Sequence, residues 1–186
     1  LDVRHEDEFV KEHVPGSVFI GLNGTFAPWV GALIADVNQP LLLVTPEGKE
    51  EEAVTRLARV GFDNTLGFLR GGIAAWKAAG HDTDSIRSVS PEAFAQAMEN
   101  SDPIVVDSRK PGEFNAGHVL DAINLPLDTV NERFNEVPED EFYIHCAGGY
   151  RSVIMASLLK RRGIHNLINV EKGFGGIKNT SVKTTI

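Results

Sequence analysis

Apolar runs and helical patterns alternate along the second half of the chain. Short apolar runs have the length of buried strands, and they lie at residues 103–106, 122–125, 141–144 and 167–170. The longest helical pattern covers 150–162, and Gly163 after it provides a C-terminal stop. Shorter helical or turn segments are expected at 111–117 and 127–134. Strands that alternate with helices predict an α/β fold in which helices flank a parallel sheet.

The segment before the first of these strands has the pattern of a helix start. Ser90 suits an N-cap and Pro91 the first helical turn, and an amphipathic run follows to Met98. Residues 80–88 are polar without a clear period, which is typical of a linker. Residues 22–35 are ambiguous, because their apolar positions fit either a helix or a packed loop.

The chain contains an internal repeat. At a constant offset of 105 residues, Asp2, Arg4, Phe9, His13 and Val14 fall opposite Asp107, Arg109, Phe114, His118 and Val119. Later segments align in the same order: 41–44 with 142–145, 61–64 with 163–166, and 70–71 with 172–173. The repeat predicts two α/β domains, at 1–80 and 89–186. The first domain begins directly at a strand, so we expect it to be N-terminally incomplete. The chain would then be part of a longer protein, which could have a further domain upstream.

Composition excludes several classes of protein. The chain has 186 residues, of which 42% are hydrophobic and 24% charged, an ordinary globular composition. No apolar run has the length of a membrane span, so we expect no membrane partner. The formal charge of −8 argues against a nucleic-acid partner. The single cysteine, Cys146, excludes an intrachain disulfide and favours a reducing, cytoplasmic location.

The sharpest chemical feature is the segment that follows the predicted strand 141–144. Cys146 is followed by Gly148, Gly149 and Arg151, and then by the strong helical pattern. Both glycines can adopt backbone angles closed to other residues, so successive N–H groups can turn inward. Together with a helix N-terminus they would form an anion cradle that favours a thiolate, and Arg151 adds a planar cation suited to oxyanions. The alternative is that Cys146 is a small buried hydrophobe.

The first copy lacks this chemistry. Thr45 stands where Cys146 stands, and Pro46 has no N–H to offer. Glutamates 50–52 add negative charge where the second copy would hold an anion. We therefore interpret the first copy as catalytically silent.

The pattern Cys146-x-x-Gly149-x-Arg151 resembles the active-site loop of the rhodanese (sulfurtransferase) family. The upstream segments Asp107-x-Arg109, Glu113-Phe114 and 117–119 share that resemblance, which extends over nearly the whole chain as two rhodanese-like domains. A silent copy followed by a copy with a cysteine loop is similar to the C-terminal part of metallo-β-lactamase-fold/rhodanese fusion proteins, which are linked to persulfide handling. None of the metal-binding histidine motifs of that upstream domain lies in this chain.

The resemblance implies a mechanism and its residues. A small-molecule sulfur donor, thiosulfate or a persulfide, gives its outer sulfur to Cys146, and a thiol acceptor removes that sulfur from the resulting persulfide. Arg151 would orient the loop or contact the donor, and Arg109 could pair with Glu113. The expected substrate-binding residues are Ala147, Gly148, Gly149, Tyr150, Arg109 and Asp107. No cofactor is implied.

Two other functions remain open. A cysteine phosphatase or arsenate reductase also uses a cysteine, a backbone nest and an arginine, but its loop has five residues between them, whereas four intervene here. The pair of domains could instead be a non-catalytic interaction module in which Cys146 senses sulfur or oxidants. No two histidines have metal-ligand spacing on a helix, so no metal site is expected.

Overall fold

The chain divides into two compact units, Leu1–Ser85 and Ile86–Ile186. The computed structural model describes residues 1–185, so Ile186, the last residue of the predicted second domain, lies outside the described residues. Within the described part, no helix has the length and apolar character needed to cross a membrane. We call these units unit 1 and unit 2.

Unit 2 is built on a five-stranded parallel sheet, which confirms the α/β prediction. Its strand order is β3-β8-β7-β4-β6, and the strands are β3 (Ser88–Val89), β8 (Leu167–Val170), β7 (Phe142–His145), β4 (Ile104–Asp107) and β6 (Ile123–Asn124). The central strand β7 pairs along its whole length with β4, from Ile104↔Phe142 to Asp107↔His145. A separate antiparallel pair joins β5 (His118–Val119) to β9 (Thr184–Thr185).

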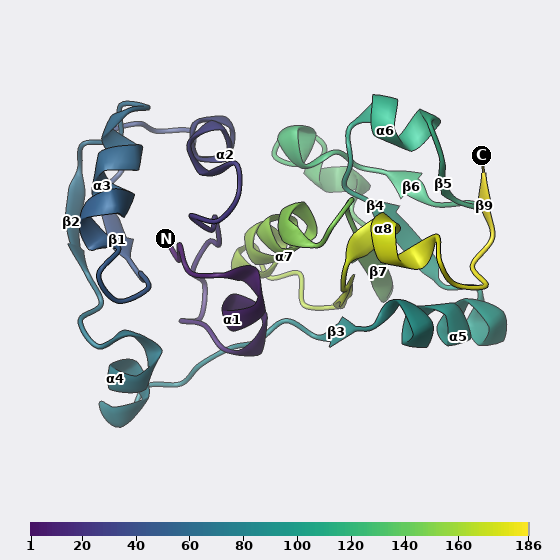
Figure 1. The fold of residues 1–186 in the computed structure, drawn as a ribbon, viewed down its shortest axis with the longest axis horizontal. Helices are drawn as coiled ribbons and strands as arrows, with labels where there is room; N and C mark the ends of the chain where they lie inside the picture. The colour runs from purple at the N-terminus through teal and green to yellow at the C-terminus, as the bar shows by residue number, and fades with distance from the viewer. Residues whose placement is uncertain (186) are drawn as a thin grey trace. The chain divides into compact units, whose positions relative to one another are not determined.

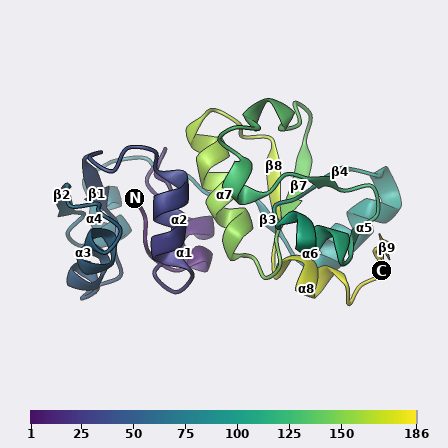
Figure 2. The same ribbon diagram turned by 90° about the horizontal axis from the view of Figure 1, so that it is seen from above.

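Helices cover both faces of this sheet. Figure 2 shows α7 (Tyr150–Arg161) on one side of β7 and β8 and α5 (Pro91–Ser101) on the other. As predicted, Ser90 is the N-cap of α5, and its hydroxyl accepts a hydrogen bond from the Ala93 N–H at 3.2 Å. Short helices α6 (Pro111–Asn115) and α8 (Gly173–Ile177) follow β4 and β8. The helix expected at 127–134 is instead two single 3₁₀ turns, Leu127–Thr129 and Phe134–Glu136, as is common for connectors of this length.

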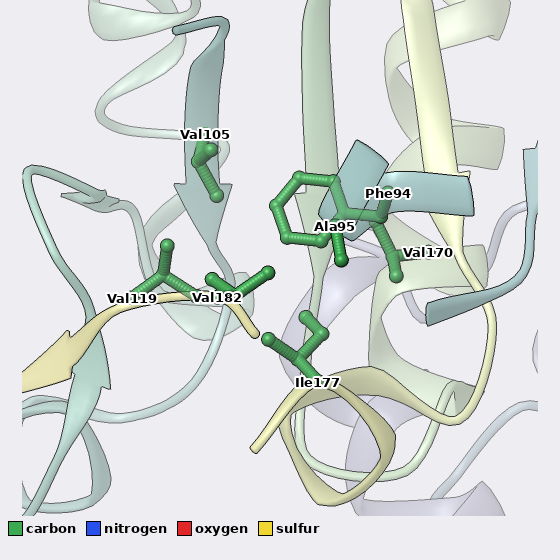
Figure 3. Packing of buried hydrophobic residues seen from close by; sticks show 7 residues of the cluster. All are labelled: Phe94, Ala95, Val105, Val119, Val170, Ile177 and Val182. Atoms are coloured by element: carbon green, nitrogen blue, oxygen red, sulfur yellow. The ribbon is translucent and has the colours of Figure 1, made fainter. Parts of the chain in front are cut away.

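The core between α5 and the sheet draws on distant parts of the chain. Figure 3 shows its seven buried residues, Phe94, Ala95, Val105, Val119, Val170, Ile177 and Val182. The Phe94 ring also lies 5.1 Å from the ring of Tyr143 on β7. Since side chains alternate along a strand, Tyr143 faces α5 while its fully buried neighbours Phe142 and Ile144 face the other side. This packing fixes the sheet whose central strand leads into the cysteine.

Unit 1 has a smaller version of the same arrangement. Strands β1 (Leu41–Leu43) and β2 (Thr65–Phe68) are parallel, and Asp2 bridges both Val44 and Phe19. The helices are α1 (Glu6–Lys11), α2 (Phe26–Leu33), α3 (Glu50–Ala58) and α4 (Gly72–Ala78). The ambiguous segment 22–35 therefore contains a helix, α2, which buries Phe26, Val30 and Leu33.

Candidate active site

The cysteine loop lies at the carboxyl end of the central strand of unit 2. Cys146 is the first residue after β7, and α7 begins at Tyr150. In open parallel sheets this edge, where strands end and helices begin, is where ligands bind. The first turn of α7 places its backbone N–H groups and the positive end of its dipole beside the cysteine. The position suits a group that carries negative charge.

The sulfur of Cys146 is buried and accepts a backbone hydrogen bond. Its residue is 1% exposed, and the Gly149 N–H donates to Sγ at 3.1 Å. Gly149 has φ 115°, which favours glycine and turns this N–H toward the sulfur. Gly148, by contrast, lies outside the positive-φ region, so the expectation that both glycines adopt special angles is wrong for Gly148. The hydrogen bond fits a nucleophile, whereas the burial fits the packing alternative.

The loop carbonyls are held away from the sulfur by the start of α8. The Phe174 N–H donates to the Cys146 carbonyl at 2.7 Å, and the Gly175 N–H donates to the Ala147 carbonyl at 2.9 Å. Gly173 permits this approach, because a Cβ there would collide with the Cys146 carbonyl oxygen. Sequence reasoning missed these residues. The available signal was that a glycine follows the last strand in both copies of the repeat.

Arg151 is bound to a carboxylate of a distant helix. Its two terminal nitrogens donate to Glu113 of α6 at 2.6 and 2.7 Å. The hydrogen bond to Arg151 lowers the pKa of Glu113, and the same bond raises the pKa of Arg151. The expected pair of Arg109 and Glu113 is therefore wrong. Glu113 neutralises the loop arginine, and Arg109 is already bound elsewhere.

Arg109 and Asp107 form a buried pair at the end of β4. Arg109 Nε lies 2.9 Å from each Asp107 carboxylate oxygen, and its Nη2 donates to the Gly117 carbonyl at 2.8 Å. The guanidinium also stacks 4.1 Å from the ring centroid of Phe174. Asp107 is 0% exposed and Arg109 is 5% exposed, so they offer little surface to a substrate. Their contacts connect the end of β4 to Gly117, after α6, and to Phe174 on α8. We interpret them as positioning residues, not as the substrate contacts that the sequence suggested.

His145, the last residue of β7, is a neutral neighbour of the loop. Burial lowers its pKa, which disfavours the imidazolium. Its Nδ1 lies 3.1 Å from the Cys146 carbonyl, which can only accept, so Nδ1 carries the proton. Nε2 has no hydrogen-bond partner among the described residues and lies 3.9 Å from Asp107 Oδ2. The histidine therefore holds the loop backbone and adds no charge to it.

The remaining predicted site residues mark the open side of the loop. Gly148 is exposed, and a Cβ added to it would meet nothing within 4 Å. Ala147 and Tyr150 on either side are partly buried. The loop is therefore exposed at Gly148, whereas Cys146 itself is buried.

The corresponding place in unit 1 has a different charge pattern. Thr45 Oγ1 donates to Glu50 at 3.4 Å, and the alignment that sets Thr45 opposite Cys146 sets Glu50 opposite Arg151. The residue opposite Glu113 is Glu8. A cavity of about 560 Å³ lies over this loop, and its lining includes Glu8, Thr45, Glu47, Glu50, Phe68 and Arg70. Unit 1 thus has carboxylates beside Thr45 and in the cavity over its loop, and it has no thiol. Across the described residues, no cluster of three or more histidine, cysteine, aspartate or glutamate side chains could hold a metal ion.

Comparison with known proteins gives one family for both units. The family model described as "Rhodanese-like domain" matches residues 1–79 and 90–180. The protein YrkF of Bacillus subtilis (strain 168) is 35% identical over 94 residues, which cover 50% of this chain and 51% of that protein, so the match spans about half of it. A protein of Allochromatium vinosum named "Sulfurtransferase" is 29% identical over 90 residues, which cover 47% of this chain and 84% of that protein. The crystal structure of a thiosulfate sulfurtransferase from Pseudomonas aeruginosa is 21% identical, with a TM-score of 0.44, over 98% of this chain and 39% of that chain.

Proposed function

The chain belongs to the rhodanese-like domain family, and from that premise we propose that unit 2 is a sulfurtransferase that carries sulfane sulfur as a persulfide of Cys146. The observation that carries the proposal is the hydrogen bond from the Gly149 N–H to Cys146 Sγ at the start of α7. A backbone donor at a helix N-terminus stabilises a thiolate, and afterwards it can stabilise the terminal sulfur of a persulfide. The relative named as a sulfurtransferase supports the same chemistry.

The proposed first half-reaction moves one sulfur atom to the enzyme. The Cys146 thiolate attacks the outer sulfur of the donor, the new S–S bond forms, and the donor's own bond to that sulfur breaks. The leaving group is sulfite when the donor is thiosulfate, and it is the corresponding thiolate when the donor is a persulfide. The negative charge ends on the outer sulfur of the Cys146 persulfide, where the loop amides can hold it.

The second half-reaction restores the cysteine. An acceptor thiolate attacks the outer sulfur, takes it as a new persulfide, and returns the electron pair of the S–S bond to Cys146. One sulfur atom enters and one leaves, so the cycle needs no cofactor and no external oxidant. The physiological donor and acceptor, a cytoplasmic location and an upstream metallo-β-lactamase-fold domain stay predictions.

The ion pair of Arg151 and Glu113 supports this chemistry by fixing the loop. It ties the first turn of α7 to α6, while the α8 amides tie the loop carbonyls on the other side. The loop is thus held from two directions before a donor arrives. Such preorganisation lowers the free energy needed to align the loop amides with the negative charge that develops on the sulfur.

Intact mass spectrometry tests the proposal directly. Incubation with thiosulfate or glutathione persulfide should add one sulfur atom to the chain, and a thiol acceptor should remove it. Cys146→Ser is the matched control and should gain none. If wild-type chain gains no sulfur from either donor while remaining folded, the proposal is wrong.

A non-catalytic sensing module is the second candidate, and the burial of Cys146 at 1% exposure favours it. A sensor would acquire sulfur or an oxidised cysteine without passing it on. Multiple-turnover transfer to a thiol separates the two, because only the enzyme regenerates free Cys146 in each cycle. Hydrolysis of an aryl phosphate, measured beside it, checks the phosphatase alternative.

A further inference from the structure

Two ion pairs neutralise the charged side chains beside the cysteine loop. Asp107 binds Arg109 at the end of β4, and Glu113 of α6 binds Arg151 in the first turn of α7. Figure 1 shows α6 following β4 and α7 following β7. His145 is fully buried, and burial lowers its pKa, so it adds no charge. The negative charge of a thiolate in this loop is therefore stabilised mainly by backbone donors.

The N–H groups with which either arginine would bind a sulfonate are already used. Arg109 donates to Asp107 and to the Gly117 carbonyl, and it is 5% exposed. Both terminal nitrogens of Arg151 donate to the Glu113 carboxylate. A guanidinium binds an oxyanion through the same paired N–H groups. A donor with a sulfonate would therefore compete with Glu113 for Arg151.

Glu113 is the more exposed member of its pair. Its side chain is 39% exposed, whereas that of Arg151 is 19% exposed. The hydrogen bond from Arg151 lowers the pKa of Glu113, so the carboxylate is charged at neutral pH. An anion placed near Arg151 is therefore also close to a carboxylate, whose repulsion offsets the attraction of the guanidinium.

A lysine beside the loop does not replace this lost attraction. The backbone nitrogen of Lys172 would lie 3.6 Å from a Cβ added to Gly149, but Lys172 is an exposed residue. An exposed ammonium group is strongly hydrated, and salt screens its charge. It therefore attracts an anion more weakly than a free arginine in the loop would.

We propose that Glu113 determines donor specificity: it disfavours thiosulfate, a dianion, and leaves an organic persulfide as the preferred donor. This inference rests on the proposed sulfur transfer and names the class of its donor. In thiosulfate the attacked sulfur is bonded to a sulfonate, which brings negative charge close to both the thiolate and Glu113. In an organic persulfide the attacked sulfur is bonded to the sulfur of a thiol, which carries no sulfonate charge. Specificity of this kind comes from a repulsive group, and Glu113 supplies it.

Thiosulfate and methanethiosulfonate are a matched pair of probes for this charge. Both present an outer sulfur bonded to a sulfonyl sulfur, but a methyl group replaces one charged oxygen in methanethiosulfonate. Attack by the Cys146 thiolate breaks the S–S bond of either probe, leaves a Cys146 persulfide, and releases sulfite or methanesulfinate. Because the intrinsic reactivity of each probe is the same for every variant, a change in the ratio of their rates reports the charge of the site.

The experiment measures the rate of sulfur addition to Cys146 by intact mass, at several concentrations of each probe. Glu113→Gln removes the charge and keeps an oxygen that can accept from Arg151. We expect it to raise the rate constant for thiosulfate relative to methanethiosulfonate by at least about threefold at low ionic strength. This change should shrink in about 1 M salt. Arg151→Ala leaves Glu113 unopposed, so it should shift the ratio in the opposite direction.

Glu136→Gln is the matched control, since it removes a carboxylate that binds Arg133 at 2.6 Å elsewhere in unit 2. It should leave the ratio unchanged. If Glu113→Gln changes both rates by the same factor, Glu113 only holds the loop in place and the inference is wrong. Glutathione persulfide separates the two levels of failure. Uptake from it, with a ratio that Glu113→Gln does not change, overturns the donor specificity alone, whereas no uptake from any donor overturns sulfur transfer as well.

Discussion

The carboxylate of Glu113 and the guanidinium of Arg151 bind each other through two hydrogen bonds of 2.6 and 2.7 Å, across 38 residues of sequence. This pair joins α6 to the first turn of α7 and so defines one side of the cysteine loop. The charge of Arg151 is therefore already neutralised by Glu113 before a sulfur donor binds. The arginine therefore acts first on the geometry of the loop.

Replacing Arg151 should consequently affect turnover more than stability. We expect Arg151→Ala to lower sulfur transfer at least about tenfold, because the loop amides lose their alignment. The pair is partly exposed, so the free energy of unfolding should fall by only about 1 kcal/mol or less. Arg133→Ala, which breaks the exposed pair with Glu136, is the control and should leave transfer unchanged. Equal losses of transfer in both variants would contradict the positioning role.

Cys146→Ser should abolish transfer while the chain stays folded. The hydroxyl nearly matches the thiol in volume, so we expect the free energy of unfolding to change by less than about 1.5 kcal/mol. Denaturant titration and the mass assay measure the two effects on the same sample. A much larger destabilisation would show that the cysteine is chiefly a core residue, as its burial alone suggests.

Gly173→Ala should lower sulfur transfer, although Gly173 lies on α8 and not in the cysteine loop. The new Cβ would collide with the Cys146 carbonyl, and φ at this position is 51°. The Phe174 and Gly175 amides would be displaced from the loop carbonyls, so we expect transfer to fall by about tenfold or more. Gly163→Ala is a matched control, since it has φ 89° but nothing within 4 Å of the added Cβ, and it should cost about 1 kcal/mol of stability with transfer intact.

The buried imidazole of His145 makes the stability of unit 2 depend on pH. Burial holds the pKa of His145 below its ordinary value of 6.5, so between the two values the unfolded chain binds a proton that the native chain does not. The free energy of unfolding should therefore decrease as the pH falls below about 6.5, and this group should have no effect above that pH.

Chemical denaturation of His145→Gln measures that contribution. The variant should show a shallower fall in unfolding free energy below pH 6.5 than the wild-type chain. His165→Gln, which changes an exposed histidine of the same unit, should retain the wild-type slope. An unchanged slope in His145→Gln would mean that another group titrates in this range.

A cysteine placed in unit 1 should remain inactive. Thr45→Cys, made in the Cys146→Ser chain, puts a thiol beside Glu50 and next to Pro46, which has no N–H. Glu50 contacts Thr45 and Glu8 lines the same cavity, so the nearby carboxylates oppose a thiolate. We expect no sulfur added from thiosulfate or a persulfide in the mass assay. Ready formation of a persulfide at residue 45 would show that the charge pattern is unimportant.

The sequence by itself determined the local elements and the place of the cysteine. Strand lengths, the Ser90–Pro91 helix start and the stop at Gly163 follow from backbone preferences that act within a few residues. The repeat added the two-domain organisation and the silent first copy, because equivalent residues keep their order, and the cysteine-loop pattern added the family resemblance. Cys146 at the end of a strand and the start of a helix follows from the same local signals.

Only the tertiary structure decided which groups bind each other. Two arginines and two carboxylates were available near the loop, and the sequence could not tell that Arg109 takes Asp107 while Arg151 takes Glu113. The burial of Cys146 and the role of Gly173 were hidden for the same reason. Each depends on distances between segments far apart in the chain, and these are set by how the sheet and helices pack, not by the preferences of any one segment.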